Sequence, residues 1–325
     1  MKSTSLLGIT ACVLIVSFGA AAIQESQGTS LNSPDCIKAP EARAELPGDE
    51  VLGVGRNGEY CAYPLRMMAF HRVVNDHLGG PPILVAYNPD AAMGQVYDPV
   101  IEKKEYNFDS AGLRGGIPVL KDRETGSTWS IATGIAIEGP MKGRKMARIP
   151  SWIINWKRFS ELHPDAYVLK EDAKQTVHYV TRVTAPKCPL LPSIQAKPDK
   201  RLAADTLVFG LAGPSGEYAI PLTIFASTKG IFVNGSTVVF YDSVGTAAGA
   251  YIAEIKGKRL TFSAIEKDRV RLFKDRETGS VWNIEGLAVE GPMKAEALAS
   301  VPSGRCRWFA WSAVFPKTRV LKSLK

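Results

Sequence analysis

"KDRETGSTW", at Lys121–Trp129, returns with one letter changed as "KDRETGSVW", at Lys274–Trp282. In each stretch a polar turn closed by glycine joins two apolar runs, which is typical of a β-hairpin. We expect Asp122 to accept backbone N–H bonds in the turn, Gly126 to supply a positive φ angle and Trp129 to enter the core. Because both stretches keep these residues, we interpret them as structural. The second stretch repeats them as Asp275, Gly279 and Trp282.

Other phrases also occur twice and in the same order. "GEYCAYPL" is answered by "GEYAIPL", "IEGPMK" by "VEGPMK", and "ILVAYN" by "TVVFYD". We interpret this as an internal duplication that gives two tandem homologous β-rich modules, residues 49–170 and 205–325. Strand-like runs around Gly-Gly-Pro-Pro and Asn-Gly turns predict hairpins in both. The fold is therefore predicted to be mainly β, with one short helix near the end of each module, at 151–162 and 307–314, and the modules are expected to pack on each other.

The segments outside the modules have their own composition. Residues 1–22 combine Lys2 with an apolar run and small residues, which predicts a cleaved signal peptide and a secreted or periplasmic protein. An uncleaved membrane anchor and a lipoprotein signal ending at Cys12 are the alternatives, and the mature chain has no membrane span. Residues 23–48 are predicted to be an irregular arm, and residues 171–204 a Pro-rich extended connector.

Cysteine and charge patterns exclude several functions. Four cysteines follow the predicted signal, and four cysteines allow three disulfide pairings. We predict a disulfide between Cys36 and Cys188, which both lie in irregular segments. No cysteine stands in C-x-x-C or in metal-ligand spacing with histidine, so we predict no cofactor. The net charge of +8 comes from Lys and Arg scattered among acidic residues, which argues against nucleic acid as a partner.

One dense group of titratable side chains stands in the first module. On a predicted hairpin, His71, Asn75 and His77 are expected to share one face of a strand, with Asp76 on the other. His71, Asp76 and His77 are the candidates for a general base or a metal ligand, although no metal site is assigned. The second module has no histidine, so the fold does not require these residues. Further candidates, for binding, are Asn75, Tyr87 and Asn88.

Several motifs together resemble a known family. "HRVVND", "DRETGSTW", "AIEGPMKG", "HPDAYVL" and "RWFAWSAVFPKTRV" are similar to motifs of the bacterial and archaeal family catalogued as domain of unknown function 3179. The resemblance covers most of the chain and implies no activity. Family members typically read Y-C-P-L-C-G where this chain reads Tyr87-Asn88-Pro89-Asp90-Ala91-Ala92, so both cysteines are absent here. Any function that rests on those thiols is lost in this protein.

Two functional hypotheses follow. The first is a secreted, non-enzymatic binding or structural protein built from two similar modules. The alternative is a metal-dependent enzyme or hydrolase with its site around His71 and His77. Nucleophile-elbow, zinc-protease, phosphate-loop and dinucleotide motifs do not occur in the sequence. We therefore favour the first hypothesis.

Overall fold

The computed structural model describes residues 29–42, 48–179, 199–225 and 230–321. Strands predominate there and every helix is short, so the predicted mainly β fold is confirmed. Within these ranges no helix has the length and apolar character needed to cross a membrane. The predicted signal segment and Cys188 lie outside the described residues. We call residues 29–42 and 48–179 together the first half, and residues 199–225 and 230–321 the second half.

The first half contains three sheets and a small hairpin. One sheet has the order β15-β3-β4-β16-β2, a second β1-β5-β6-β7-β14, and a third β10-β11-β12-β13. The bounds are β1 (Leu31–Asn32), β2 (Cys36–Lys38), η1 (Ala39–Glu41), β3 (Glu50–Arg56), β4 (Glu59–Pro64), α1 (Leu65–His71), β5 (Val73–His77), β6 (Pro82–Asn88), β7 (Met93–Asp98), β8 (Val100–Ile101), β9 (Lys104–Glu105), β10 (Phe108–Arg114), β11 (Ile117–Asp122), β12 (Thr128–Ser130), β13 (Ala136–Glu138), β14 (Ala147–Ile149), β15 (Ser151–Asn155), α2 (Trp156–Leu162), β16 (Tyr167–Leu169) and η2 (Thr176–His178).

The second half has sheets of order β28-β17-β18-β29, β19-β20-β21 and β24-β25-β26-β27. The bounds are β17 (Leu207–Gly213), β18 (Gly216–Pro221), α4 (Leu222–Phe225), β19 (Ile231–Asn234), β20 (Thr237–Asp242), β21 (Ala247–Ile252), β22 (Glu254–Ile255), β23 (Lys258–Arg259), β24 (Phe262–Lys267), β25 (Val270–Asp275), β26 (Val281–Trp282), β27 (Ala288–Glu290), β28 (Ser303–Arg307), α5 (Trp308–Val314) and β29 (Arg319–Val320). The order of these strands along the chain follows that of the first half from β3 onward, except that β14 has only the isolated bridge between Ser300 and Tyr251 as its counterpart. Superposition of the halves as two copies of one module stays a prediction.

Two predictions about local structure were wrong. The predicted helix at 151–162 begins only at Trp156, because Ser151–Asn155 forms strand β15 and pairs with β3. The N-terminal arm was predicted to be irregular, yet its described part contributes two short strands. In this arm β1 pairs with β5, and β2 pairs with β16. Both errors have one cause, since short strands at sheet edges depend on partners far along the chain.

The repeated phrase forms the same buried turn twice. The Asp122 carboxylate accepts hydrogen bonds from the Trp129 indole Nε1, at 2.8 Å, and from the backbone N–H of Ser127, at 3.1 Å. Burial raises the pKa of Asp122, but hydrogen bonds from Trp129, Thr125 and Ser127 outweigh this effect and hold the pKa below its ordinary value. Gly126 has a φ of +71°. The second turn reproduces the indole contact at 2.8 Å, between Trp282 and Asp275.

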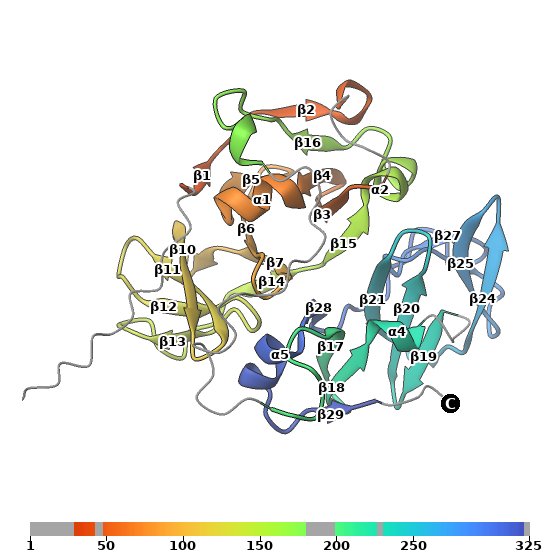
Figure 1. Ribbon diagram of the computed structural model, residues 1–325. Helices are drawn as coiled ribbons and strands as arrows, with labels where there is room; N and C mark the ends of the chain where they lie inside the picture. The colour runs from red at the N-terminus through yellow and green to blue at the C-terminus, as the bar shows by residue number, and fades with distance from the viewer. Residues whose placement is uncertain (1–28, 43–47, 180–198, 226–229, 322–325) are drawn as a thin grey trace, which may run out of the picture.

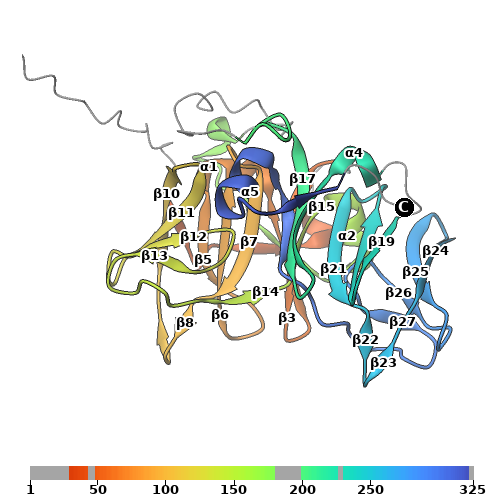
Figure 2. The same cartoon turned by 90° about the horizontal axis from the view of Figure 1, so that it is seen from below.

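The two halves exchange helices to complete their hydrophobic cores. α5 of the second half brings Trp308 and Phe309 into the cluster that contains Trp129 of the first half. Reciprocally, α2 of the first half brings Phe159 into the cluster that contains Trp282. Figures 1 and 2 show α5 lying over the sheet of β11 and β12, and α2 directed toward the sheets of the second half. Each main cluster is therefore built from both halves.

The strands between these clusters are buried on both faces. Along β3, Leu52 and Val54 contact their own half, while Val51 contacts the cluster shared with the second half. β17 does the same, with Phe209 turned to its own half and Val208 to the first. Burial on two faces explains why these strands read as continuous apolar runs without alternating polar residues.

The buried turns generate a prediction about stability. Trp129→Ala and Trp282→Ala should each lower the free energy of unfolding by about 3–5 kcal/mol, since each removes a large core side chain and takes one hydrogen-bond donor from a buried carboxylate. Urea denaturation followed by circular dichroism measures the change. The exposed Val233 provides the control, because Val233→Ala should stay within about 0.5 kcal/mol of the parent. Tryptophan variants as stable as that control would contradict a core role for the turns.

Candidate functional site

A turn of the first half meets the second half at Asn88–Ala91. This turn joins β6 to β7, and the buried Asn88 accepts a hydrogen bond from the Ala91 N–H at 2.9 Å. The Ala91 carbonyl accepts from the backbone N–H of Arg307, 2.8 Å away, just before α5 begins. Asn88 and Ala91 stand where the resemblance places the two cysteines. In this chain an asparagine side chain closes the turn instead.

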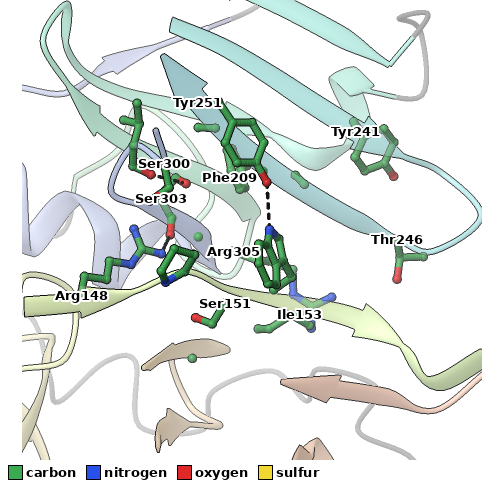
Figure 3. Close-up of a pocket in the computed structure, with 18 of the residues that line it drawn as sticks. Arg148, Ser151, Ile153, Phe209, Tyr241, Thr246, Tyr251, Ser300, Ser303 and Arg305 are labelled. Carbon is green, nitrogen blue, oxygen red and sulfur yellow. Dashed lines mark hydrogen bonds between the residues drawn. The ribbon is translucent and has the colours of Figure 1, made fainter. Parts of the chain in front are cut away.

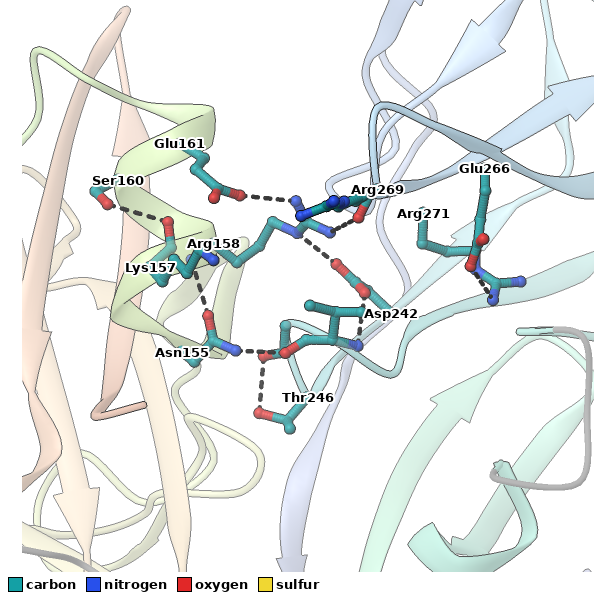
Figure 4. Close-up of polar contacts among 12 residues, drawn as sticks. Asn155, Lys157, Arg158, Ser160, Glu161, Asp242, Thr246, Glu266, Arg269 and Arg271 are labelled. Carbon is teal, nitrogen blue, oxygen red and sulfur yellow. Dashed lines mark hydrogen bonds and ion pairs between the residues drawn. The ribbon is translucent and has the colours of Figure 1, made fainter. Parts of the chain in front are cut away.

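The corresponding turn of the second half contains an ion pair. Asp242 accepts from the Val244 N–H at 2.9 Å, and its other oxygen lies 2.7 Å from Nε of Arg158 on α2. The two side chains are 1% and 3% exposed, and Figure 4 shows them meeting between the halves. The Asn155 N–H donates to the Gly245 carbonyl at 2.9 Å, which repeats the backbone contact of the first turn. At the turn of the second half, the Arg158–Asp242 ion pair thus stands where the turn of the first half has Asn88.

Charged side chains also surround the first turn. Arg72 lies 3.4 Å from Asp90, and Arg305 forms a two-point ion pair with Glu50 that includes a 2.7 Å contact. Burial raises the pKa of Tyr87 to about 12, although Arg305 opposes the shift. Tyr87 is consequently a neutral hydroxyl at physiological pH.

A cavity of about 570 Å³ opens between the halves next to this turn, and we call it the open cavity. Its walls come from β7, the turn before β13, and β14 on one side and from β28, α5 and the end of β17 on the other. None of the described residues that line it is acidic. Those residues are Met93, Gln95, Tyr97, Ala132, Thr133, Ile135, Lys145, Met146, Ala147, Arg148, Ala212, Pro302, Ser303, Gly304, Arg305, Cys306, Trp311 and Phe315.

Three polar side chains in the wall have atoms without a hydrogen-bond partner, and they are Gln95, Arg148 and, at its Nε, Arg305. Gln95 is 4% exposed and donates to the Ser303 carbonyl at 3.3 Å, but its Oε1 has no hydrogen-bond partner. Arg148 donates from Nη2 to the same carbonyl, while its Nε is buried without a partner. Buried polar atoms without partners are costly and uncommon in native proteins. All three side chains belong to the wall of the open cavity.

A second pocket, the closed cavity, adjoins the open one, with which it shares Arg148, Ser303, Gly304 and Arg305, and measures only about 40 Å³. Strand pairing shows that Trp152 and Gly304 hold equivalent positions, because Gly304 pairs with Gly210 of β17 whereas Trp152 pairs with Gly53 of β3. Trp152 donates from Nε1 to the Tyr251 hydroxyl at 3.1 Å (Figure 3). A tryptophan ring therefore fills one cavity, and a glycine leaves the other open.

Two polar residues of the open cavity differ from their counterparts in the second half, and one of them, Arg148, lines the closed cavity as well. Arg148 pairs with Tyr97, whereas the equivalent bridge in the second half joins Ser300 to Tyr251. Aligning the two repeated sequences places Gly249 opposite Gln95. Arg148 and Gln95 thus have a serine and a glycine as their counterparts. Sequence reasoning missed them, yet this asymmetry between the repeats was a signal that could have found them.

The histidine prediction was wrong in its geometry. His71 ends helix α1 and does not lie on the strand with Asn75 and His77. Its Nδ1 lies 2.9 Å from the Thr29 carbonyl and its Nε2 lies 3.0 Å from the Tyr179 hydroxyl, while burial lowers its pKa. His71 is therefore a buried, hydrogen-bonded residue.

Its predicted neighbours have separate roles. Asn75 exchanges hydrogen bonds with the backbone of Phe108, at 3.0 and 2.9 Å, and Asp76 accepts from the buried Tyr63 hydroxyl at 2.8 Å. His77 is exposed at the end of β5. Among described residues, no three His, Cys, Asp or Glu side chains gather in a metal-binding arrangement. By contrast, the predicted binding candidates Tyr87 and Asn88 lie at the first turn, beside the open cavity.

The described cysteines form no disulfide. Burial raises the pKa of the Cys61 thiol, and the neighbouring Cys36 raises it further. The Cys36–Cys188 pairing stays a prediction, since Cys188 is not described. Cys306 lines the open cavity, and burial holds its pKa well above the ordinary thiol value.

The family is settled by comparison with family models. The model for a protein of unknown function, DUF3179, matches residues 29–318. This chain belongs to the DUF3179 family. The match includes both halves, so the shared cores and both cavities are parts of the DUF3179 region. Neither the curated proteins nor the solved structures contain a significant match to the chain.

The ion pair at the second turn generates a prediction. Arg158→Met should lower the free energy of unfolding by about 3–5 kcal/mol, because it leaves the Asp242 carboxylate buried without its partner. The double variant Arg158→Met/Asp242→Leu should lose less than the single variant, since no charge stays buried. Chemical denaturation of both variants measures this difference.

An exposed ion pair serves as the control for that measurement. Arg114 and Glu138 are more than half exposed, so Arg114→Met should cost no more than about 1 kcal/mol. A double variant less stable than Arg158→Met alone would show that the ion pair itself stabilises the interface.

Proposed function

We propose that this protein binds a small molecule in the open cavity and is not an enzyme. The observation that carries the proposal is the difference between two equivalent positions, Trp152 and Gly304. On one side the tryptophan fills the space between the halves, and on the other about 570 Å³ stays open. Cavities of about 300–1,000 Å³ are typical of small-molecule sites.

The chemistry of the wall supports binding. Apolar side chains dominate it, and Gln95 and Arg148 add two polar side chains, each with a buried atom that has no hydrogen-bond partner. A ligand that satisfies these atoms removes the penalty for leaving them unpaired. A mostly apolar wall with a few placed polar groups matches the usual composition of a ligand site.

Ionisation states favour binding over catalysis. The raised pKa values of Tyr87 and Cys306 keep both groups protonated at neutral pH, so neither is an activated base or nucleophile. The enzyme alternative around His71 and His77 loses support, because the hydrogen bonds of His71 fasten α1 to Thr29 and Tyr179.

A variant designed from the equivalent positions of the other half should abolish binding. The double variant Gln95→Gly/Gly304→Trp introduces at these two positions the residues that stand at the equivalent positions, Gly249 and Trp152. The new tryptophan ring should then fill the open cavity. The glutamine must change too, because a Cβ at position 304 would lie 2.6 Å from its Nε2. The neutral fluorophore N-phenyl-1-naphthylamine should bind the parent protein saturably, with enhanced fluorescence, and should not bind this double variant.

A tryptophan placed on the surface is the matched control. Val100 is exposed on β8, so Val100→Trp adds an indole without entering the cavity and should bind the probe like the parent. Equal unfolding midpoints of the three proteins show that they are folded alike. A double variant that is folded and still binds the probe with parental affinity would contradict the proposal.

A further inference from the structure

We propose that the ligand of the open cavity is an amphipathic carboxylate whose head group is held by Arg148. This inference rests on the proposed function and adds the chemical class of the ligand. Three cations, Lys145, Arg148 and Arg305, line the cavity, and no described acidic residue does. The local charge of the wall is accordingly positive.

The three cations differ in what neutralises them. Arg305 has its counter-ion in Glu50, and Lys145 is exposed to solvent. Arg148 forms no ion pair with any described residue. Its protein contact is the neutral carbonyl of Ser303, and burial lowers its pKa. Arg148 is half-buried, and a guanidinium partly withdrawn from water without a counter-ion is unfavourable, so an anionic ligand gains affinity by supplying one.

The geometry of Arg148 suits a carboxylate in particular. Nη2 is engaged by Ser303, while Nε is buried at the cavity wall and has no partner. Guanidinium N–H groups hold carboxylate oxygens in planar hydrogen bonds that are stronger than neutral ones. β14 keeps this side chain in place by pairing Arg148 with Tyr97 of β7.

The other residues of the wall are suited to binding an apolar part of the ligand. The apolar members of the wall come from both halves, and the larger ones are Met93, Ile135, Met146, Trp311 and Phe315. A hydrocarbon chain that fills this space removes apolar surface from water on both sides. A small inorganic anion would satisfy Arg148 but would leave this surface uncovered. The combination of one unpaired cation and an apolar wall therefore specifies an amphipathic anion.

Three probes with the same chain and different heads test the inference. Dodecanoate, dodecanol and dodecyltrimethylammonium are titrated into the full protein by calorimetry, below their micelle concentrations. We expect dodecanoate to bind about ten- to a hundredfold more tightly than dodecanol, as a hydrogen bond to a charged group implies, and the cationic probe to bind weakest. Arg148→Gln should abolish the preference for dodecanoate and leave dodecanol affinity unchanged, whereas Arg148→Lys should keep much of the preference.

Arg144 provides the matched control, since its exposed side chain follows β13 and contacts Glu102 outside the cavity. Arg144→Gln should bind all three probes like the parent. Equal affinities for dodecanoate and dodecanol in the parent, or an unchanged preference in Arg148→Gln, would overturn the carboxylate inference while the cavity stays a binding site. If none of the probes binds, or if binding survives in Gln95→Gly/Gly304→Trp, both the inference and the proposed function fail.

Discussion

The insertion of each helix into the opposite half's core is the interaction on which the rest of this structure depends. α2 and α5 are short, and helices of about two turns have little stability of their own. Their aromatic side chains, Phe159 on α2 and Trp308 on α5, gain it by entering clusters built around the tryptophans of the repeated turns. The sheets between the clusters must then be apolar on both faces. Neither half can complete the cluster around its repeated-turn tryptophan without the other.

The packing of α2 and α5 against the opposite halves also creates two equivalent positions between the halves, and different residues occupy them. At one, Trp152 and Tyr251 meet across the interface, and at the other Gly304 faces Gln95 and Arg148. Similarly, one turn holds the Arg158–Asp242 ion pair, and the other ends in Asn88 with an unpartnered amide nitrogen. The tryptophan thus fills the space at one position, and the glycine leaves space at the other. Stable packing requires only filled space, whereas a binding site requires an open one.

Sequence patterns predicted the features that depend on neighbouring residues. The mainly β class and the short helix beginning at Trp308 followed from local runs, turn residues and flanking prolines. The positions of β1, β2 and β15 did not, because their pairing partners lie far along the chain. For the site, local density of titratable groups pointed to His71, which is buried and hydrogen-bonded. Gln95, Arg148 and Gly304 lie far apart in sequence and form a site only where the halves meet.

Native-state hydrogen exchange of the Trp282→Ala protein tests the exchange of helices most directly. Trp282 belongs to the second half, but its cluster includes α2 of the first. The account predicts that the backbone amides of α2 (Trp156–Leu162) lose protection together with β25 and β26, while those of α5 keep theirs. Loss of protection confined to residues 207–320, with α2 unchanged, would show that each half has its own core and would contradict the account.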